Sequence, residues 1–167
     1  ITKTVDDNTK IIFVCSPNNP TANLMDAETI MRLCQTFQDT ALIVVDETYI
    51  EFSSEETSIE QIDDFPNLVV LRTLSKSHAA AGLRCGVAVA HSGVSKLLHK
   101  VLAPYPMAVP VIKEALSILK PENMARLAKK RADIVARRDE YVAIMAGLDD
   151  VNSVLPSNAN YLLLLVS

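Results

Sequence analysis

Residues 41–46 read ALIVVD, and this run decides the fold together with three others like it. The matching runs are IIFVC at 11–15, NLVVLRT at 67–73 and CGVAVAH at 85–91. Runs that are apolar at almost every position are typical of strands covered on both faces, whereas a strand with one wet face alternates apolar and polar residues. The pattern therefore predicts an α/β fold: a mostly parallel sheet with helices on both faces.

Helical patterns separate and follow these runs. A helix is predicted between the first two strands, with Asp26 as its N-cap and an apolar stripe on one side. The stripe consists of Ile30, Leu33, Cys34 and Phe37. Two more helices are expected, at 94–102 and at 121–147, the second opening on a proline and closing on a glycine. A last strand is predicted at 160–166, with no partner strand elsewhere in the sequence.

The stretch APYPMAVP, residues 103–110, holds three prolines, which cannot continue a helix or a central strand. It predicts a boundary between two domains. Residues 1–107 are expected to be part of a large domain, and residues 108–167 the beginning of a smaller α+β domain.

Composition excludes several classes of protein. In 167 residues, 49% are hydrophobic and the net charge is −4, which favours a packed globular protein and disfavours general binding to nucleic acid or an anionic membrane. No apolar run is long enough to span a bilayer, and residues 1–10 lack a signal-peptide pattern. Cys15, Cys34 and Cys85 are odd in number and far apart, so we expect free core cysteines in a reducing cytoplasm.

Two further features have ordinary explanations. The basic stretch ARLAKKRADIVARR is interleaved with acidic residues such as Asp133 and Asp139, which is typical of the solvated face of a packed helix. His91 and His99 have no carboxylate or cysteine at the spacing of metal ligands, so no metal site is predicted.

Polar residues follow three of the strands, at the point where each strand ends. Parallel strands end at the same edge of a sheet, where ligands of α/β proteins bind, so these residues should become neighbours. An arginine returns to the same edge after the turn SHAAAG. The expected site set is Asn19, Asp46, Tyr49, Thr73, Ser75, Lys76 and Arg84.

Taken singly, these residues suit a proline-framed turn, a strand-end cap and a solvated lysine. Taken together, they offer an amine, a fixed carboxylate, a phenol and an arginine that can bind phosphate. Pyridoxal phosphate, an aldehyde with a basic ring nitrogen and a phosphate, needs that whole set. A lysine held beside cations and away from water would also have a pKa below its usual value, as an imine-forming amine requires.

Four motifs, SPNNPT, VDETYIEF, LRTLSKSHAAAGLRCG and APYPMAVP, occur in order between residues 16 and 110. The chain resembles the fold-type-I pyridoxal-phosphate-dependent aminotransferases, and within them the histidinol-phosphate aminotransferases. The resemblance implies that Lys76 forms the Schiff base and then moves a proton between the substrate Cα and C4′ of the cofactor. Asp46 would pair with the pyridinium nitrogen, and Asn19 and Tyr49 would bind the 3-oxygen. The phosphate would be held by Thr73, Ser75 and Arg84.

The chain departs from the family pattern at two positions. Ala22 stands where the family usually has glycine, and alanine strains the turn if that position needs a positive φ. His78 stands where an aromatic residue is common. It is either a substituted packing residue or a new catalytic group.

The resemblance implies a cytoplasmic homodimer in histidine biosynthesis that transaminates L-histidinol phosphate with 2-oxoglutarate. Small molecules are the expected partners, with no nucleic acid and no membrane. The alternatives are an aromatic aminotransferase, a threonine-phosphate decarboxylase, or a non-enzymatic regulator that senses the cofactor. Family members are more than twice this length, so we expect an incomplete chain that is inactive by itself.

Overall fold

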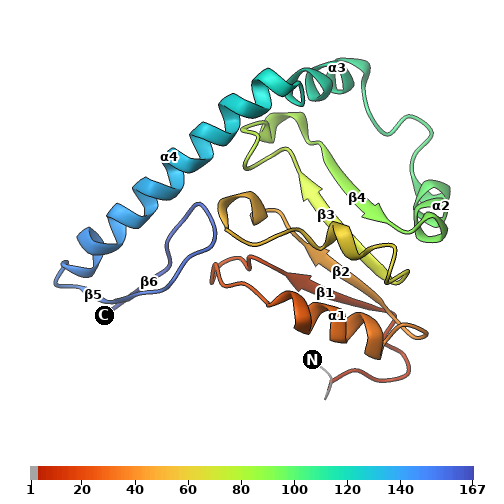
Figure 1. Cartoon of the computed structure of the whole chain (residues 1–167), viewed down its shortest axis with the longest axis horizontal. Helices are drawn as coiled ribbons and strands as arrows, with labels where there is room; N and C mark the ends of the chain where they lie inside the picture. Colours follow the sequence, from red (N-terminus) through yellow and green to blue (C-terminus); the bar gives the residue numbers. More distant parts are fainter. Residues whose placement is uncertain (1–3) are drawn as a thin grey trace.

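The computed structural model describes residues 4–167; residues 1–3, the first of the expected large domain, lie outside the described residues. Four strands form one sheet in the order β1-β2-β3-β4 (Figure 1). They are β1 (Ile11–Cys15), β2 (Leu42–Asp46), β3 (Leu68–Thr73) and β4 (Gly86–Ala90). The first three are parallel and β4 is antiparallel, which confirms the predicted mostly parallel α/β sheet.

Helices and a second, smaller sheet complete the described chain. The α-helices are α1 (Ala27–Thr36), α2 (Ser92–Val101), α3 (Val109–Ile118) and α4 (Pro121–Ala146). The 3-10 helices are η1 (Ile50–Phe52), η2 (Ser58–Gln61) and η3 (Ala81–Leu83). The second sheet pairs β5 (Val151–Val154) with β6 (Leu164–Val166) in antiparallel fashion. Within residues 4–167, no helix combines the length and the apolar character that crossing a membrane requires.

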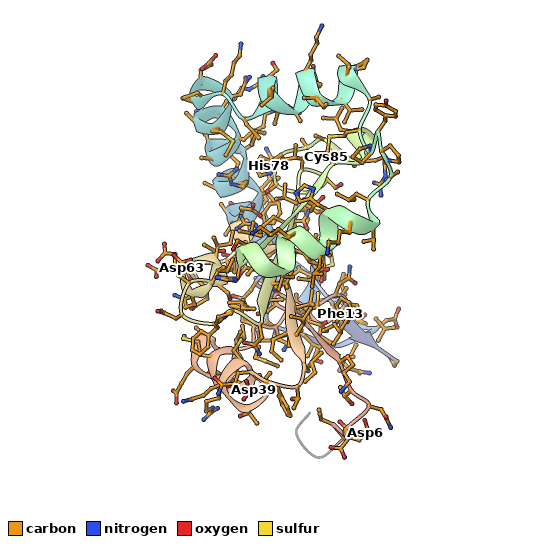
Figure 2. All side chains as sticks on the ribbon, turned by 90° about the vertical axis from the view of Figure 1, so that its right-hand side faces the viewer. Asp6, Phe13, Asp39, Asp63, His78 and Cys85 are labelled. Carbon is orange, nitrogen blue, oxygen red and sulfur yellow. The ribbon has the colours of Figure 1, made fainter. Side chains whose placement is uncertain are left out.

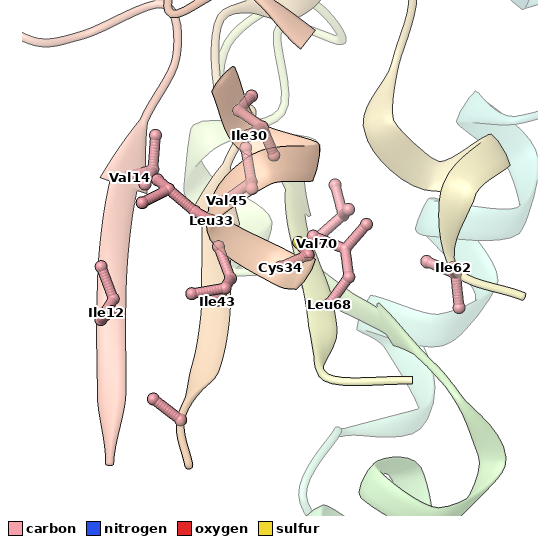
Figure 3. Close-up of a cluster of buried hydrophobic side chains, with 11 residues drawn as sticks. Ile12, Val14, Ile30, Leu33, Cys34, Ile43, Val45, Ile62, Leu68 and Val70 are labelled. Atoms are coloured by element: carbon pink, nitrogen blue, oxygen red, sulfur yellow. The ribbon is translucent and has the colours of Figure 1, made fainter. Parts of the chain in front are cut away.

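The main core lies between α1 and one face of the large sheet (Figure 3). Asp26 caps α1 by accepting a hydrogen bond from the Thr29 amide at 2.7 Å, as predicted. Because side chains alternate along a strand, every second residue of β1, β2 and β3 meets the helix. The buried residues of this core include Ile12, Val14, Ile30, Leu33, Cys34, Ile43, Val45, Leu68 and Val70.

The opposite face of the sheet is covered only in its middle. Val44 and Val69 on the central strands are buried there. On β1, however, Phe13 (labelled in Figure 2) is 70% exposed. On β4, Ala88 pairs with Leu71 on this same face and is exposed as well. Among the described residues, the helical covering expected for this face is therefore missing at the two outer strands.

The structure differs from the expectations in two places. Helix α3 was not predicted, because the prolines concealed a helix start: Pro110 lies in its first turn, where a missing N–H costs nothing. The last strand does have a partner, since β6 pairs with β5. Helix α4 forms from Pro121 to its C-cap Gly147 as predicted; of its apolar residues, Leu127 is buried and Ile144 is exposed.

Candidate active site

The three parallel strands end at one edge of the sheet. Register pairs Cys15 with Asp46 and Asp46 with Leu71, so the loops that follow β1, β2 and β3 are neighbours. Strand β4 runs antiparallel and starts at that same edge. The convergence predicted from the sequence is confirmed, and the roles assigned to the site residues stay predictions.

At this edge the side-chain amide of Asn19 contacts the phenol of Tyr49. Asn19 donates from Nδ2 to the Tyr49 hydroxyl at 3.1 Å. The Tyr49 ring is buried, and Nζ of Lys76 lies 5.5 Å from its centroid. Because the Tyr49 oxygen accepts from Asn19, its own proton stays available to donate to a ligand oxygen.

The lysine is more open to solvent than expected. We predicted that Lys76 is held away from water, and it is exposed in the structure. Of the described residues, the Tyr49 ring borders its ammonium group. The part of the prediction that rested on burial of Lys76 is therefore wrong for this chain.

Asp46 is the last residue of β2, and its carboxylate is half-buried at the edge of the sheet. Its Oδ1 accepts from the Thr48 amide at 3.0 Å and from the Thr48 hydroxyl at 2.5 Å. These bonds form the local turn that an aspartate at a strand end often makes. Both fall on one oxygen, so the turn does not use up the acceptor capacity of the carboxylate.

The sequence did not predict an ion-pair network around Arg72. Arg72 lies 3.4 Å from Glu47 Oε2 and 2.5 Å from Glu51 Oε1, and the Glu47 side chain is only 2% exposed. The Glu47 carboxylate also accepts from the Thr57 hydroxyl and the Ser58 amide. Neighbouring residues on a strand point to opposite faces, so Asp46 and Glu47 take different roles. This alternation was the feature of the sequence that could have indicated a separate role for Glu47.

The hydroxyl pair expected to bind phosphate lies at the end of β3, and the arginine expected to join it lies just before the start of β4. Thr73 donates to the Cys85 carbonyl at 3.3 Å, and its Oγ1 accepts from the Ser75 amide at 3.1 Å. The two hydroxyl oxygens lie 3.0 Å apart. Arg84 is exposed, and its Nη1 donates to the Ala81 carbonyl at 3.1 Å. These groups supply donors suited to an anion at one corner of the edge.

The loop after β1 is strained where alanine replaces the expected glycine. Ala22 has φ of 56° and is almost fully buried. Its amide donates to the Asn18 carbonyl at 2.7 Å, which closes the turn that carries Asn19. The predicted condition for strain, a positive φ at Ala22, is met.

His78 is a packed residue. It is buried, and its Nδ1 lies 2.9 Å from the Ser77 hydroxyl oxygen. Burial lowers the pKa of His78, an effect that the nearby Glu51 opposes and that Arg131 and Arg72 reinforce. The nearby residues Leu74 and Ala80 pack with Cys85 against helix α3 (His78 and Cys85 are labelled in Figure 2). These surroundings favour the packing interpretation over a catalytic one.

A second tyrosine, Tyr161, reaches the same edge of the sheet from the C-terminal part of the chain, and no sequence motif had indicated it. Tyr161 precedes β6, and its hydroxyl donates to the Asn18 carbonyl at 2.7 Å. Its ring meets the Tyr49 ring edge-on, with centroids 5.4 Å apart. Only the folded chain brings these residues together, so their sequence spacing carried no signal.

The arrangement suits a carbonyl cofactor with an anionic tail better than a metal. Within residues 4–167, His, Cys, Asp and Glu side chains form no group of three that could hold a metal ion. A cavity of about 280 Å³ beside the strand ends is lined by Glu47, Glu55 and Glu56, which would repel an anion. The amine, the phenol and the anion donors lie at the open edge instead. The residues present therefore fit pyridoxal phosphate there.

Comparisons with known proteins agree with this chemistry. The sequence profile of the family described as "Aminotransferase class I and II" matches residues 1–166. The chain is 44% identical over 157 residues to a histidinol-phosphate aminotransferase of Pectobacterium carotovorum, covering 94% of this chain and 44% of that protein. It is 42% identical over 154 residues to histidinol-phosphate aminotransferase 2 of Mannheimia succiniciproducens, covering 92% and 44%. The chain thus spans less than half the length of these curated relatives.

Solved structures are similar as well. The histidinol-phosphate aminotransferase of Sinorhizobium meliloti in complex with pyridoxal-5'-phosphate matches with a TM-score of 0.80 and 27% identity, over 91% of this chain and 41% of that one. The L-threonine-O-3-phosphate decarboxylase of Porphyromonas gingivalis matches with a TM-score of 0.80 and 27% identity, over 94% and 48%.

Proposed function

The chain belongs to the aminotransferase class I and II family, and from this premise we propose that the whole protein is a pyridoxal-phosphate-dependent transaminase of L-histidinol phosphate and 2-oxoglutarate. The observation that carries the proposal is the single edge that gathers Lys76, the Asn19–Tyr49 pair and Asp46. The substrate follows the names of the relatives that are 42% and 44% identical.

Each site residue of the chain would have its own role in binding the cofactor or in the reaction. Pyridoxal phosphate supplies an aldehyde that bonds to amines and a ring that draws electrons away from the substrate Cα. Lys76 would provide the amine that holds the cofactor and later the base that accepts a proton. Asp46 would place a negative charge beside the ring nitrogen, and Asn19 and Tyr49 would donate to the 3-oxygen. The anion donors are Thr73, Ser75 and Arg84.

Further properties of the whole protein belong to the same proposal. We propose small-molecule substrates, a homodimer, a cytoplasmic location and the division at residues 107 and 108. The two separate sheets support the division. The three free cysteines support a reducing compartment. Exposed apolar side chains, among them Phe13 and Tyr105, support burial against further protein.

The test uses the whole protein that carries this chain. It should form glutamate from L-histidinol phosphate and 2-oxoglutarate and should show visible absorbance with pyridoxal phosphate. We expect Lys76→Ala to abolish both signals, because it removes the amine that would bond to the aldehyde of the cofactor. The matched control is Lys100→Ala, at an exposed lysine of α2, which should keep both. An active Lys76→Ala variant would contradict the proposal.

A decarboxylase is the second candidate, supported by the equally similar decarboxylase structure. The same preparation, given L-threonine O-3-phosphate, would then release carbon dioxide without consuming 2-oxoglutarate. Binding of pyridoxal phosphate with neither reaction would instead support the regulator alternative.

A further inference from the structure

Tyr161 contacts two of the loops that form the proposed cofactor site. Its hydroxyl donates to the Asn18 carbonyl at 2.7 Å, although 143 residues separate the two. The edge of its ring meets Tyr49 with an interplanar angle of 82°. Figure 1 shows the segment between β5 and β6 lying next to the loop after β1. One side chain of the C-terminal segment thus contacts Tyr49 and the residue that precedes Asn19.

The backbone around Tyr161 is itself fixed to the site. The Asn158 amide donates to the Ala22 carbonyl at 2.8 Å. Arg138 of helix α4 donates from Nη1 to the Ala159 carbonyl at 2.8 Å, and Ala159 is completely buried. These bonds hold the segment before Tyr161 from both sides, so its contacts are those of an anchored residue.

These contacts constrain the groups that would bind the cofactor. The Asn18 carbonyl belongs to the peptide that leads into Asn19, so a hydrogen bond to it limits how far the Asn19 amide can move from Tyr49. The edge-on ring contact limits rotation of the Tyr49 ring. Partial burial raises the pKa of Tyr161, with a smaller contribution from Tyr49, so its hydroxyl keeps the proton that it donates.

We propose that Tyr161 is a positioning residue that holds Asn19 and Tyr49 where both can donate to the 3-oxygen of pyridoxal phosphate. This inference rests on the proposed function. It assigns to the C-terminal segment a direct part in cofactor binding, although Tyr161 itself need not touch the cofactor.

The test measures cofactor binding by the whole protein. We compare Tyr161→Phe, which keeps the ring and loses the hydroxyl, with Tyr161→Leu, which loses both contacts. The first should weaken the affinity for pyridoxal phosphate roughly threefold to tenfold, the range expected for one lost hydrogen bond. The second should weaken it further. The matched control is Tyr141→Phe, at a half-exposed tyrosine of α4, which should leave the affinity unchanged.

A second measurement separates positioning from mere stabilisation. Donors on the 3-oxygen stabilise its negative charge most when the Lys76 nitrogen beside it has lost its proton. Loosening the donors should therefore raise the pH midpoint of the visible absorbance change, by about half a unit for Tyr161→Phe. A variant that only loses stability would lower the melting temperature without moving this midpoint.

The outcomes are distinct. If the wild-type protein binds pyridoxal phosphate and Tyr161→Phe keeps both affinity and midpoint, the positioning role is wrong and the proposed function stands. A lowered melting temperature alone overturns the positioning role in the same way. A wild-type protein without visible absorbance overturns the proposed function and this inference with it.

Discussion

The side-chain amide of Asn19 donates to the hydroxyl of Tyr49 at 3.1 Å, although the two residues are 30 positions apart in the chain. The parallel pairing of β1 with β2 brings them together, because it sets the loops after both strands at one edge. The amide and the phenol can therefore act on a ligand as one unit.

We predict that Asn19 and Tyr49 are coupled in cofactor binding. Tyr49→Phe and Asn19→Ala should each weaken the affinity of the whole protein for pyridoxal phosphate, and the double variant should lose less than the sum of the two. The expected coupling is about 1 kcal/mol, the size of one hydrogen bond. Absorbance titrations of the four proteins measure it. Strictly additive losses would show that the two side chains act separately.

The ion pairs that Arg72 makes with Glu47 and Glu51 contribute to the stability of the protein. We predict that Arg72→Met lowers the free energy of unfolding by about 3 kcal/mol, because it leaves the carboxylates of Glu47 and Glu51 without their cationic partner. Urea denaturation of the whole protein measures the change. The control is Arg32→Met, whose ion pair with Glu28 is exposed on α1 and should contribute less than about 0.5 kcal/mol. Equal losses for the two variants would contradict a special role of the buried network.

The sequence predicted the elements whose pattern is local. The apolar runs of β1, β2 and β3 and the capped stripe of α1 are each complete within a short stretch, so the bounds of the three strands and the start of α1 were found to within a residue or two. Convergence of the strand ends followed from topology alone. That step assembled Asn19, Asp46 and Lys76 without any knowledge of the turns.

What the sequence could not predict depends on distant contacts. Strand β6 is short and finds its partner β5 only after the chain reverses, and Tyr161 meets Asn18 across almost the whole chain. The partners of Arg72 lie 21 and 25 residues away, and no periodicity marks them. The exposure of Lys76 was mispredicted for a related reason, since burial depends on which chain segments surround the crevice.

Two strained alanines allow a comparison. Ala79 has φ of 54° and is exposed, whereas Ala22 has φ of 56° and is buried. Replacing alanine by glycine at a positive φ relieves about 1–2 kcal/mol of strain in the folded protein. Glycine also makes the unfolded chain more flexible, which lowers the free energy of unfolding by about 0.4–1 kcal/mol. We therefore expect Ala79→Gly to raise the free energy of unfolding by about 0.5–1 kcal/mol.

Ala22→Gly should give little or no gain, because it also removes a buried methyl group that contributes about 0.8 kcal/mol. Thermal and urea unfolding of both variants measure the difference. A larger gain at Ala22 than at Ala79 would mean that the methyl group is itself poorly packed.

The last prediction concerns pH and His78. Burial is the main cause that lowers the pKa of this ring below its ordinary value of 6.5. Well above pH 6.5 the ring is neutral in both the folded and the unfolded chain, and the contribution of His78 to stability is complete. As the pH falls from there to the folded-state pKa, the unfolded chain takes up a proton that the folded chain refuses, so the free energy of unfolding decreases. Below the folded-state pKa both states are charged and the loss stops.

We expect His78→Phe to remove this contribution. Between about pH 7 and pH 5 its free energy of unfolding should fall less steeply than that of the wild type, by at most about 1.4 kcal/mol per pH unit. The control is His99→Gln, at an exposed residue of α2, which should follow the wild-type slope. Transamination by His78→Phe should stay within a few-fold of the wild type, because a packing residue takes no proton from the substrate. Loss of activity in a stably folded His78→Phe protein would make the ring a catalytic group, and equal pH slopes for all three proteins would show that its burial does not control acid stability.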